Sequence, residues 1–204
     1  MRCPVTLLDE PSRSDALSEL VNIGMGRAGD ALARLFNTFI QLSIPRLEFV
    51  EPARVSALIT ALVGTAGPVI AVRQAFSSRI RGEAIAIFPA AGCNALADLV
   101  GYSDVSSDEL LLEISNILVG ACVGALASQF SLALSFSPPS ILARAPVAEL
   151  FETGQLPWKR ALVAEVNFRV DDHAFCCHLL TFWPDSSIDV LIRAVDAFLA
   201  QLQG

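Results

Sequence analysis

The sequence of 204 residues has few basic groups, only two histidines and no C-x-x-C motif. It carries 14 Lys and Arg against 21 Asp and Glu, a net charge of −7, and the basic residues form no cluster. Nucleic-acid binding requires a basic face that neutralises phosphates, so this charge argues against that class. The five cysteines are odd in number and lack C-x-x-C spacing, which argues against a disulfide framework and a zinc site and fits reduced thiols in a cytosol.

Three common site signatures are also missing. The closely spaced glycines of residues 24–29 fall inside a predicted helix and not at a strand-to-helix turn, so they do not predict a phosphate-binding loop. No nucleophile elbow occurs. On a predicted strand Cys176 and His178 share one face, while Cys177 points the other way and no further ligand has useful spacing. We therefore expect no metal site.

Long apolar runs are present, although we expect no cleavable signal. The sequence is 53% hydrophobic with a mean hydropathy of +0.56, and residues 114–143 are uncharged and long enough to span a bilayer. Asn116, Gln129 and two prolines interrupt that run, and residues 1–5 are followed by a charged stretch in place of an apolar core. We expect a cytoplasmic protein that does not cross a membrane, with homodimerisation left open by the apolar excess.

A short polar pattern occurs twice at a constant distance. Each member of the first set recurs 94 residues later (15 to 109, 19 to 113, 22 to 116, 45 to 139). The first set is Asp15, Glu19, Asn22 and Pro45, and the second is Glu109, Glu113, Asn116 and Pro139. Small and apolar residues between these positions recur at the same distance, so a whole structural unit is duplicated. It preserves an acid and an amide that packing alone does not require.

The acids and the amide of each set fall in segments, 15–36 and 109–130, whose apolar residues return at three- and four-residue steps, which predicts helices. Serines precede them as candidate caps: Ser12 or Ser14, and Ser106 or Ser107. At about 100° per residue the acids and the amide of each copy share one stripe opposite the apolar face, so two exposed faces are expected. A glycine, Gly26 or Gly120, follows each Asn by four residues. Glycine costs about 1 kcal/mol in a helix interior relative to alanine, so we infer that a docking partner needs bare backbone there.

The remaining elements complete a repeated order of helix, strand, helix, strand, strand and helix. Strands are predicted over 39–50, 69–77, 83–89, 134–143, 161–170 and 174–183, and further helices over 51–64, 91–102, 146–156 and 185–202, the third of these being a helix or an irregular crossover. This order predicts an α+β fold of sandwich type with pseudo-twofold symmetry, about six mostly antiparallel strands, and the two long helices carrying the sites. We expect one domain over 1–204, made of repeats at about 10–100 and 104–204.

The run DALSELVNIGMGRAGDALARLF followed by SIP, repeated as ELLLEISNILVGACVGALASQF followed by SPP, resembles the CheC, CheX and FliY family of response-regulator phosphatases. That family's motif is Asp or Ser, three residues, Glu, two residues, Asn, twenty-two residues and Pro. The first copy fits at every position and the second at three of four, the departure being Glu109. The resemblance extends over nearly the whole chain and implies a fold in which both long helices lie on one side of the sheet.

The resemblance implies a phosphatase that accelerates hydrolysis of phospho-aspartate on a CheY-type receiver domain, in chemotaxis or related two-component signalling. The receiver is expected to supply Mg²⁺ and a lysine, so this chain needs no cofactor of its own. The expected roles divide into three sets. Asn22 and Asn116 position water, while Glu19 and Glu113 pair with the receiver lysine. Asp15, Gly26, Glu109 and Gly120 line the partner-binding edge, and Pro45 and Pro139 shape the strand beneath the helix.

Two alternatives remain beside this prediction. One is a module that binds a receiver or another chemotaxis protein without catalysis, against which the retention of both Glu and Asn argues. The other is a structural part of the flagellar switch like FliY, although we expect no room after the second repeat for that protein's additional domain. Two intact motifs favour a CheC-like arrangement, and CheD is left open as a further partner.

Overall fold

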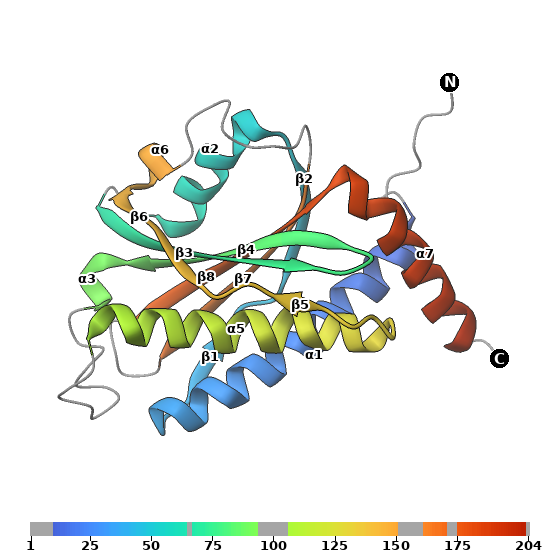
Figure 1. Cartoon of the computed structure of the whole chain (residues 1–204), viewed down its shortest axis with the longest axis horizontal. Coiled ribbons are helices and arrows are strands. Elements are labelled where there is room, and N and C mark those ends of the chain that lie inside the picture. Colours follow the sequence, from blue (N-terminus) through green and yellow to red (C-terminus); the bar gives the residue numbers. More distant parts are fainter. Residues whose placement is uncertain (1–9, 65–66, 94–105, 151–160, 171–174, 203–204) are drawn as a thin grey trace.

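The computed structural model describes residues 10–64, 67–93, 106–150, 161–170 and 175–202. One sheet forms its middle layer, with helices against both of its faces (Figure 1). The helices are α1 (Pro11–Phe36), α2 (Pro52–Val63), α3 (Ala90–Cys93), α5 (Ser107–Gln129), α6 (Val147–Leu150) and α7 (Asp185–Leu202). The strands are β1 (Ile40–Leu42), β2 (Arg46–Val50), β3 (Pro68–Ser77), β4 (Arg81–Pro89), β5 (Ser135–Phe136), β6 (Ser140–Pro146), β7 (Ala161–Val170) and β8 (Cys176–Pro184). The predicted α+β fold is confirmed.

The sheet has eight strands where about six were expected, and all of its pairings are antiparallel. The order is β1-β7-β8-β4-β3-β5, with β2 also paired to β7 and β6 also paired to β3. The eight strands therefore fill six positions, because each edge position holds two short strands in line. The predicted strands over 39–50 and 134–143 each divide into two.

A proline lies at each division of the edge strands. Pro45 falls between β1 and β2, and Pro139 falls between β5 and β6. Proline has no backbone N–H to donate, so it interrupts a continuous ladder and is tolerated at an edge. Both prolines are partly buried.

A serine two residues before each proline completes the ladder with its side chain. The Ser43 amide donates to the Asn167 carbonyl, and the Asn167 amide donates to the Ser43 hydroxyl, both at 3.0 Å. Ser137 makes the same exchange with Ala75, at 2.9 and 3.0 Å. The hydroxyl replaces the backbone carbonyl in the pair, which leaves the chain free to turn away toward the proline.

The edge strands of each repeat pair with the other repeat. β1 and β2, which follow α1, pair with β7, whereas β5 and β6, which follow α5, pair with β3. The pair β4 and β8 forms the middle of the sheet. Exchanging the first and second repeats leaves this order unchanged, which is the pseudo-twofold arrangement of the fold.

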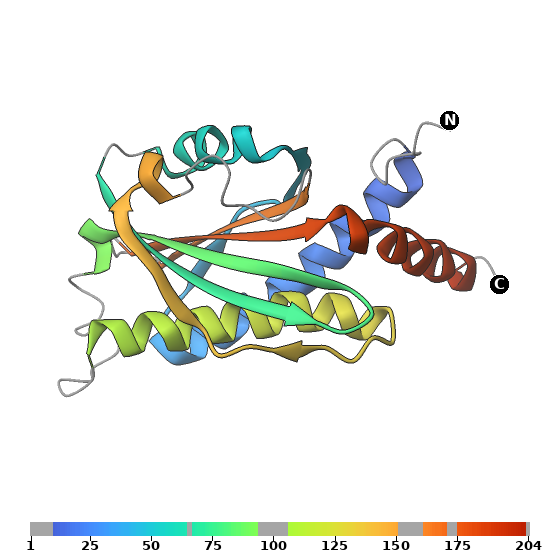
Figure 2. The same cartoon turned by 45° about the horizontal axis from the view of Figure 1, so that its top comes forward.

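The two faces of the sheet carry separate cores, because side chains alternate between the faces along each strand. α1 and α5 lie side by side on one face, and α2 and α6 lie on the other (Figure 2). On the α1 and α5 face the core contains Leu20, Met25, Phe76, Leu111, Ile114 and Trp183, among others. On the α2 face it contains Val55, Ile59, Ile85, Ile87 and Leu180, among others. The two long helices are thus held on the same side of the sheet.

Helix boundaries agree with the predictions except at the start of α1. Ser106 is the N-cap of α5, as one of its two candidates predicted. α1 instead begins at Pro11 with Glu10 as its N-cap, so neither Ser12 nor Ser14 caps it. Proline is favoured in the first helical turn, where its missing N–H has no partner to lose. The helices predicted over 91–102 and 146–156 are seen only as α3 and α6, since 94–105 and 151–160 lie outside the described residues.

One described helix, α5, is long and apolar enough to cross a membrane by length and composition. It packs against both α1 and the sheet, and 61% of its most apolar window is buried in the protein. The apolar character of α5 is therefore explained by its place in the core.

Candidate functional site

The first polar face runs along α1. Its four members are all exposed: Asp15, Glu19, Asn22 and Gly26. The buried side of the helix includes Leu17, Leu20, Gly24, Met25, Ala28, Leu32 and Phe36. This side is wide because α1 contacts both α5 and the sheet. The exposure of the acid and the amide follows from the helical period and agrees with the prediction.

The second polar face runs along α5 in the same way. Its four members are also exposed: Glu109, Glu113, Asn116 and Gly120. The opposite side is buried and includes Leu111, Ile114, Leu118, Cys122 and Ala125, as predicted. Each repeat therefore presents a Glu and an Asn to solvent, three residues apart and close to one helical turn.

Glu109 also forms hydrogen bonds at the start of its own helix. Its Oε2 accepts from the Ser106 amide and the Ser106 hydroxyl, both at 3.1 Å, while the Glu109 amide donates to the Ser106 hydroxyl at 3.2 Å. This reciprocal pair is a capping box, which supplies partners for backbone groups that a helix start otherwise leaves unpaired. The outer acid of the second face thus stabilises α5. Among the described residues Asp15 makes no such contact.

The crossing of α1 and α5 depends on Gly24. A Cβ at this position would lie 2.7 Å from the carbonyl oxygen of Cys122, closer than such atoms approach. Any side chain there would separate the two helices. Gly26 and Gly120 are different, because a Cβ at either would meet nothing within 4 Å. Packing inside the protein therefore gives no reason for these two glycines.

The Asn116 side chain is held from beneath by a buried glutamine. Gln74 lies on β3, is 2% exposed and donates from Nε2 to the Asn116 Oδ1 at 3.0 Å. The same Nε2 donates to the Ser137 carbonyl at 2.9 Å. Gln74 was not selected from the sequence. It occupies an inward strand position between the core residues Val72 and Phe76, so a polar residue in an apolar alternation was the available signal.

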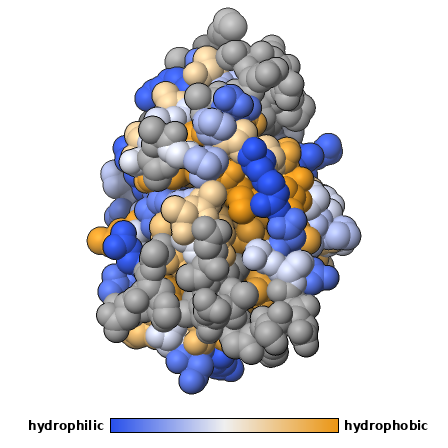
Figure 3. Space-filling view, turned by 90° about the vertical axis from the view of Figure 1, so that its left-hand side faces the viewer, coloured by the Kyte–Doolittle hydropathy of each residue, from blue (hydrophilic) through white to orange (hydrophobic). Residues whose placement is uncertain are grey.

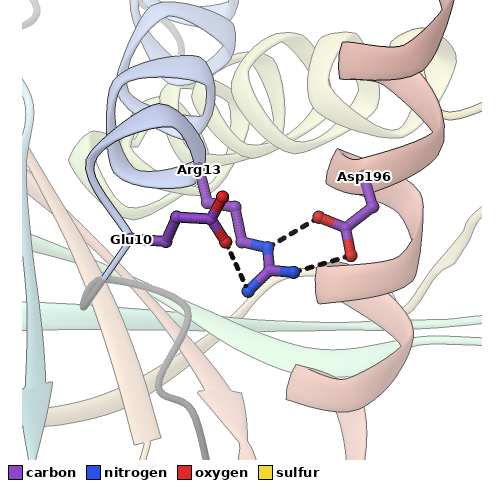
Figure 4. Close-up of polar contacts among 3 residues, drawn as sticks. All are labelled: Glu10, Arg13 and Asp196. Atoms are coloured by element: carbon purple, nitrogen blue, oxygen red, sulfur yellow. Dashed lines mark hydrogen bonds and ion pairs between the residues drawn. The ribbon is translucent and has the colours of Figure 1, made fainter.

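An ion pair fixes the start of α1 to the last helix (Figure 4). Arg13 donates to both carboxylate oxygens of Asp196 on α7, at 2.6 and 2.9 Å, and contacts Glu10 at 2.9 Å. The hydrogen bond with Asp196 raises the pKa of the Arg13 guanidinium. At the other helix, Arg144 of β6 pairs with Asp108, in the first turn of α5. Both long helices are thus anchored near their N-termini.

The remaining buried titratable groups lie away from the two polar faces. Glu165, Asn167 and His178 form a chain of hydrogen bonds on the α2 face of the sheet, at 3.0 and 2.5 Å. Burial raises the pKa of Glu165 and lowers the pKa of His178. Burial also raises the pKa of the Cys122 thiol to about 12, which keeps it protonated. No group of three or more metal-ligating side chains is found within the described ranges.

Apolar side chains reach the surface near β1 and β6. Phe39, Leu42 and Ile44 are exposed around β1, with Ile44 at 91%, and Leu142 is exposed on β6. Figure 3 faces the end at which α5 begins and shows apolar residues interspersed with hydrophilic ones.

Comparison with known proteins identifies a similar sequence family and similar folds. A sequence model described as the CheC-like family matches residues 13–48, which contain the complete first motif. The fold is similar to that of FliY from Thermotoga maritima, with a TM-score of 0.70, 16% identity, and coverage of 93% of this chain and 98% of that one.

Two further solved structures share the fold. The middle domain of FliM from H. pylori has a TM-score of 0.60 at 10% identity, covering 91% of this chain and 99% of that one. A chain of the CheX-CheY-BeF3-Mg²⁺ complex from Borrelia burgdorferi has a TM-score of 0.54 at 14% identity, covering 81% and 98%. The resemblance to the CheC, CheX and FliY family is thereby confirmed, by sequence over residues 13–48 and by fold over nearly the whole chain.

Proposed function

We propose that this protein accelerates hydrolysis of phospho-aspartate on a CheY-type receiver domain. The observation that carries the proposal is the pair of exposed Glu and Asn residues on each of the two long helices, within a fold of the CheC, CheX and FliY family. The complex of CheX with CheY, BeF3 and Mg²⁺ supports a receiver as the partner class.

The chemistry of the two faces fits a reaction in which the protein positions water. Acyl phosphates are labile, and the receiver is expected to bring its own Mg²⁺, so no nucleophile or metal is required from this chain. A carboxamide can hydrogen-bond the attacking water without placing a negative charge beside the phosphoryl oxygens. Asn22 and Asn116 have this role. Holding one water in line with phosphorus lowers the barrier by several kcal/mol, on the order of the effects seen for positioning in general.

Glu19 and Glu113 act in docking. Each lies one turn from its Asn, on the same exposed stripe. A carboxylate at this place attracts the lysine of the receiver's active site and sets the register in which the phosphoryl group meets the amide. The bare backbone at Gly26 and Gly120 leaves room for the receiver to approach.

The decisive experiment compares Asn22→Ala, Asn116→Ala and the double variant. Dephosphorylation of a phosphorylated receiver is measured by phosphate release. Each single variant retains one working face, whereas the double variant loses the stimulated rate by a factor of about a hundred or more, comparable to removal of a positioned hydrogen-bonding group in other enzymes. Gln201→Ala, which removes an exposed amide from α7, is the matched control and retains the parent rate.

A second candidate function is recognition of a receiver without hydrolysis. The fold is shared with FliM middle domains, so the fold alone does not distinguish binding from catalysis. The same variants separate the two functions when binding to a beryllofluoride-treated receiver is measured alongside turnover. A double variant that still binds but no longer stimulates hydrolysis supports catalysis. A double variant with the parent's phosphate-release rate refutes the role of both amides.

A further inference from the structure

The two polar faces are not equivalent beneath the helix surface. Gln74 is only 2% exposed, yet its side chain reaches the exposed Asn116 from the sheet side. Both hydrogens of its Nε2 have acceptors, one on Asn116 and one on the Ser137 carbonyl. Its Oε1 is buried with no hydrogen-bond partner among the described residues. An unpaired buried carbonyl is costly, so this orientation must be compensated by what Nε2 binds.

These contacts also determine which end of the Asn116 amide faces outward. Amide oxygen and nitrogen are assigned from their hydrogen-bonding partners. The Ser137 carbonyl can only accept, so the Gln74 atom beside it must be Nε2. The atom that Asn116 offers to that Nε2 must therefore be its oxygen. The amino group of Asn116 then lies on the far side of the carboxamide, with two hydrogens for a partner.

The first repeat lacks this support. The Ser137 exchange with Ala75 matches the Ser43 exchange with Asn167, so position 74 corresponds to position 166 on β7. Residue 166 is a valine, which has no hydrogen-bonding side chain. Asn22 is exposed, and within the part of the chain that the structure describes its carboxamide has no hydrogen-bond partner. Asn22 is therefore free to rotate until a partner arrives.

We propose that Gln74 is a positioning residue for the second site, because it holds the Asn116 carboxamide in one rotamer with its amino group facing outward. The Asn116 site is therefore pre-organised, and the Asn22 site is not. The inference rests on the proposed function, since it names how one of the two amides is prepared for water. A side chain already ordered before the encounter does not lose that rotamer freedom during the reaction. The Asn116 site consequently has the higher kcat of the two.

The catalytic test uses Gln74→Leu, which keeps the approximate volume and removes the donor. In an Asn22→Ala background, where only Asn116 works, the substitution lowers kcat by about three- to tenfold, the range expected for one net hydrogen bond, with KM unchanged. In an Asn116→Ala background that loss of kcat disappears, because the two residues act as one unit in a double-mutant cycle. Thr181→Val, which removes a different buried polar group from the sheet, serves as the stability control.

A second measurement does not depend on catalysis. NMR relaxation of the side-chain amide groups in the parent protein reports a rigid Asn116 and a mobile Asn22, and Gln74→Leu makes Asn116 as mobile as Asn22. Equal mobility of the two amides in the parent overturns the inference even if Gln74→Leu does not fold. A kcat that falls equally in both backgrounds also overturns it, because that result indicates a general structural effect.

Failure of the proposed function has a different signature. If the Asn22→Ala, Asn116→Ala double variant clears receiver phosphate as fast as the parent, the function is wrong whatever the NMR result. If that double variant is inactive but Gln74→Leu leaves kcat of the Asn116 site unchanged, the function stands and Gln74 has no positioning role.

Discussion

Replacing Gly26 and Gly120 by alanine should make the protein more stable and less active. A Cβ at either position meets nothing within 4 Å, so the fold accepts it without strain. Each substitution removes the backbone freedom of a glycine from the unfolded chain and gains about 0.5–1 kcal/mol. The double variant therefore gains about 1–2 kcal/mol in the free energy of unfolding. For a chain of this size that gain raises Tm by about 2–8 °C.

Activity should change in the opposite direction because of where the methyl groups point. Both project from the exposed stripe, one turn beyond Asn22 or Asn116, into the space that a docking receiver would occupy. Extra methyl groups at a fitted contact cost about 1–3 kcal/mol. We expect KM for the phosphorylated receiver to rise by about tenfold or more. Urea unfolding and thermal melts measure the first effect, and phosphate release at several receiver concentrations measures the second.

Gly124→Ala is the matched control on the same helix. A Cβ at Gly124 also meets nothing within 4 Å, so the gain in stability should be similar. The corresponding position of the first repeat, 94 residues earlier, is Asp30, which already carries a side chain paired with Arg34. A side chain there is compatible with a polar face, so KM should stay near the parent value. A stabilised double variant at positions 26 and 120 with the parent's KM would refute the idea that bare backbone serves the partner.

Two further predictions concern stability. Burial raises the pKa of Glu165 above its usual 4.5, so its contribution to stability is fully present below pH 4.5 and is lost as the pH rises through the raised pKa. Glu165→Gln should reduce this loss of stability when urea unfolding is followed from pH 4.5 to neutrality. An unchanged pH dependence would show that Glu165 is not the group responsible. Asp196→Asn should weaken the contact between α7 and Arg13 and speed amide hydrogen exchange in α7, whereas the exposed Asp189→Asn on the same helix should not; equal exchange in both variants would show that the ion pair does not hold α7.

The exposed faces were predictable because they depend on local geometry. Helical periodicity places Glu19 beside Asn22 and Glu113 beside Asn116 wherever the helix lies, provided that its apolar side is buried. The duplication added what one copy could not supply, since two matching copies identify a preserved pattern. The hairpin of β3 and β4 and the closing helix α7 were likewise predicted from alternation and period.

The rest depended on contacts between distant segments. Gln74 stands out in its strand as a polar residue at an inward position, but its partner Asn116 lies on a helix of the other repeat. Strand alternation cannot identify such a partner. The cap of α1 was missed because Pro11 allows the helix to begin before the serines that were expected to start it. The division of the edge strands was missed because a serine hydroxyl can substitute for a backbone carbonyl in a ladder.

The crossing of edge strands between the repeats has a consequence for how this architecture could have arisen. A polypeptide containing one repeat would leave the outer side of its own hairpin without a neighbouring strand, while its short strands after the long helix would have no hairpin of their own to join. Two identical copies could pair all of these strands by exchanging the short ones, which yields a symmetric, domain-swapped dimer with the same strand order. Joining the copies into one gene would make that strand exchange permanent and let each half diverge. Gln74 in one half and Val166 at the corresponding position of the other illustrate such divergence.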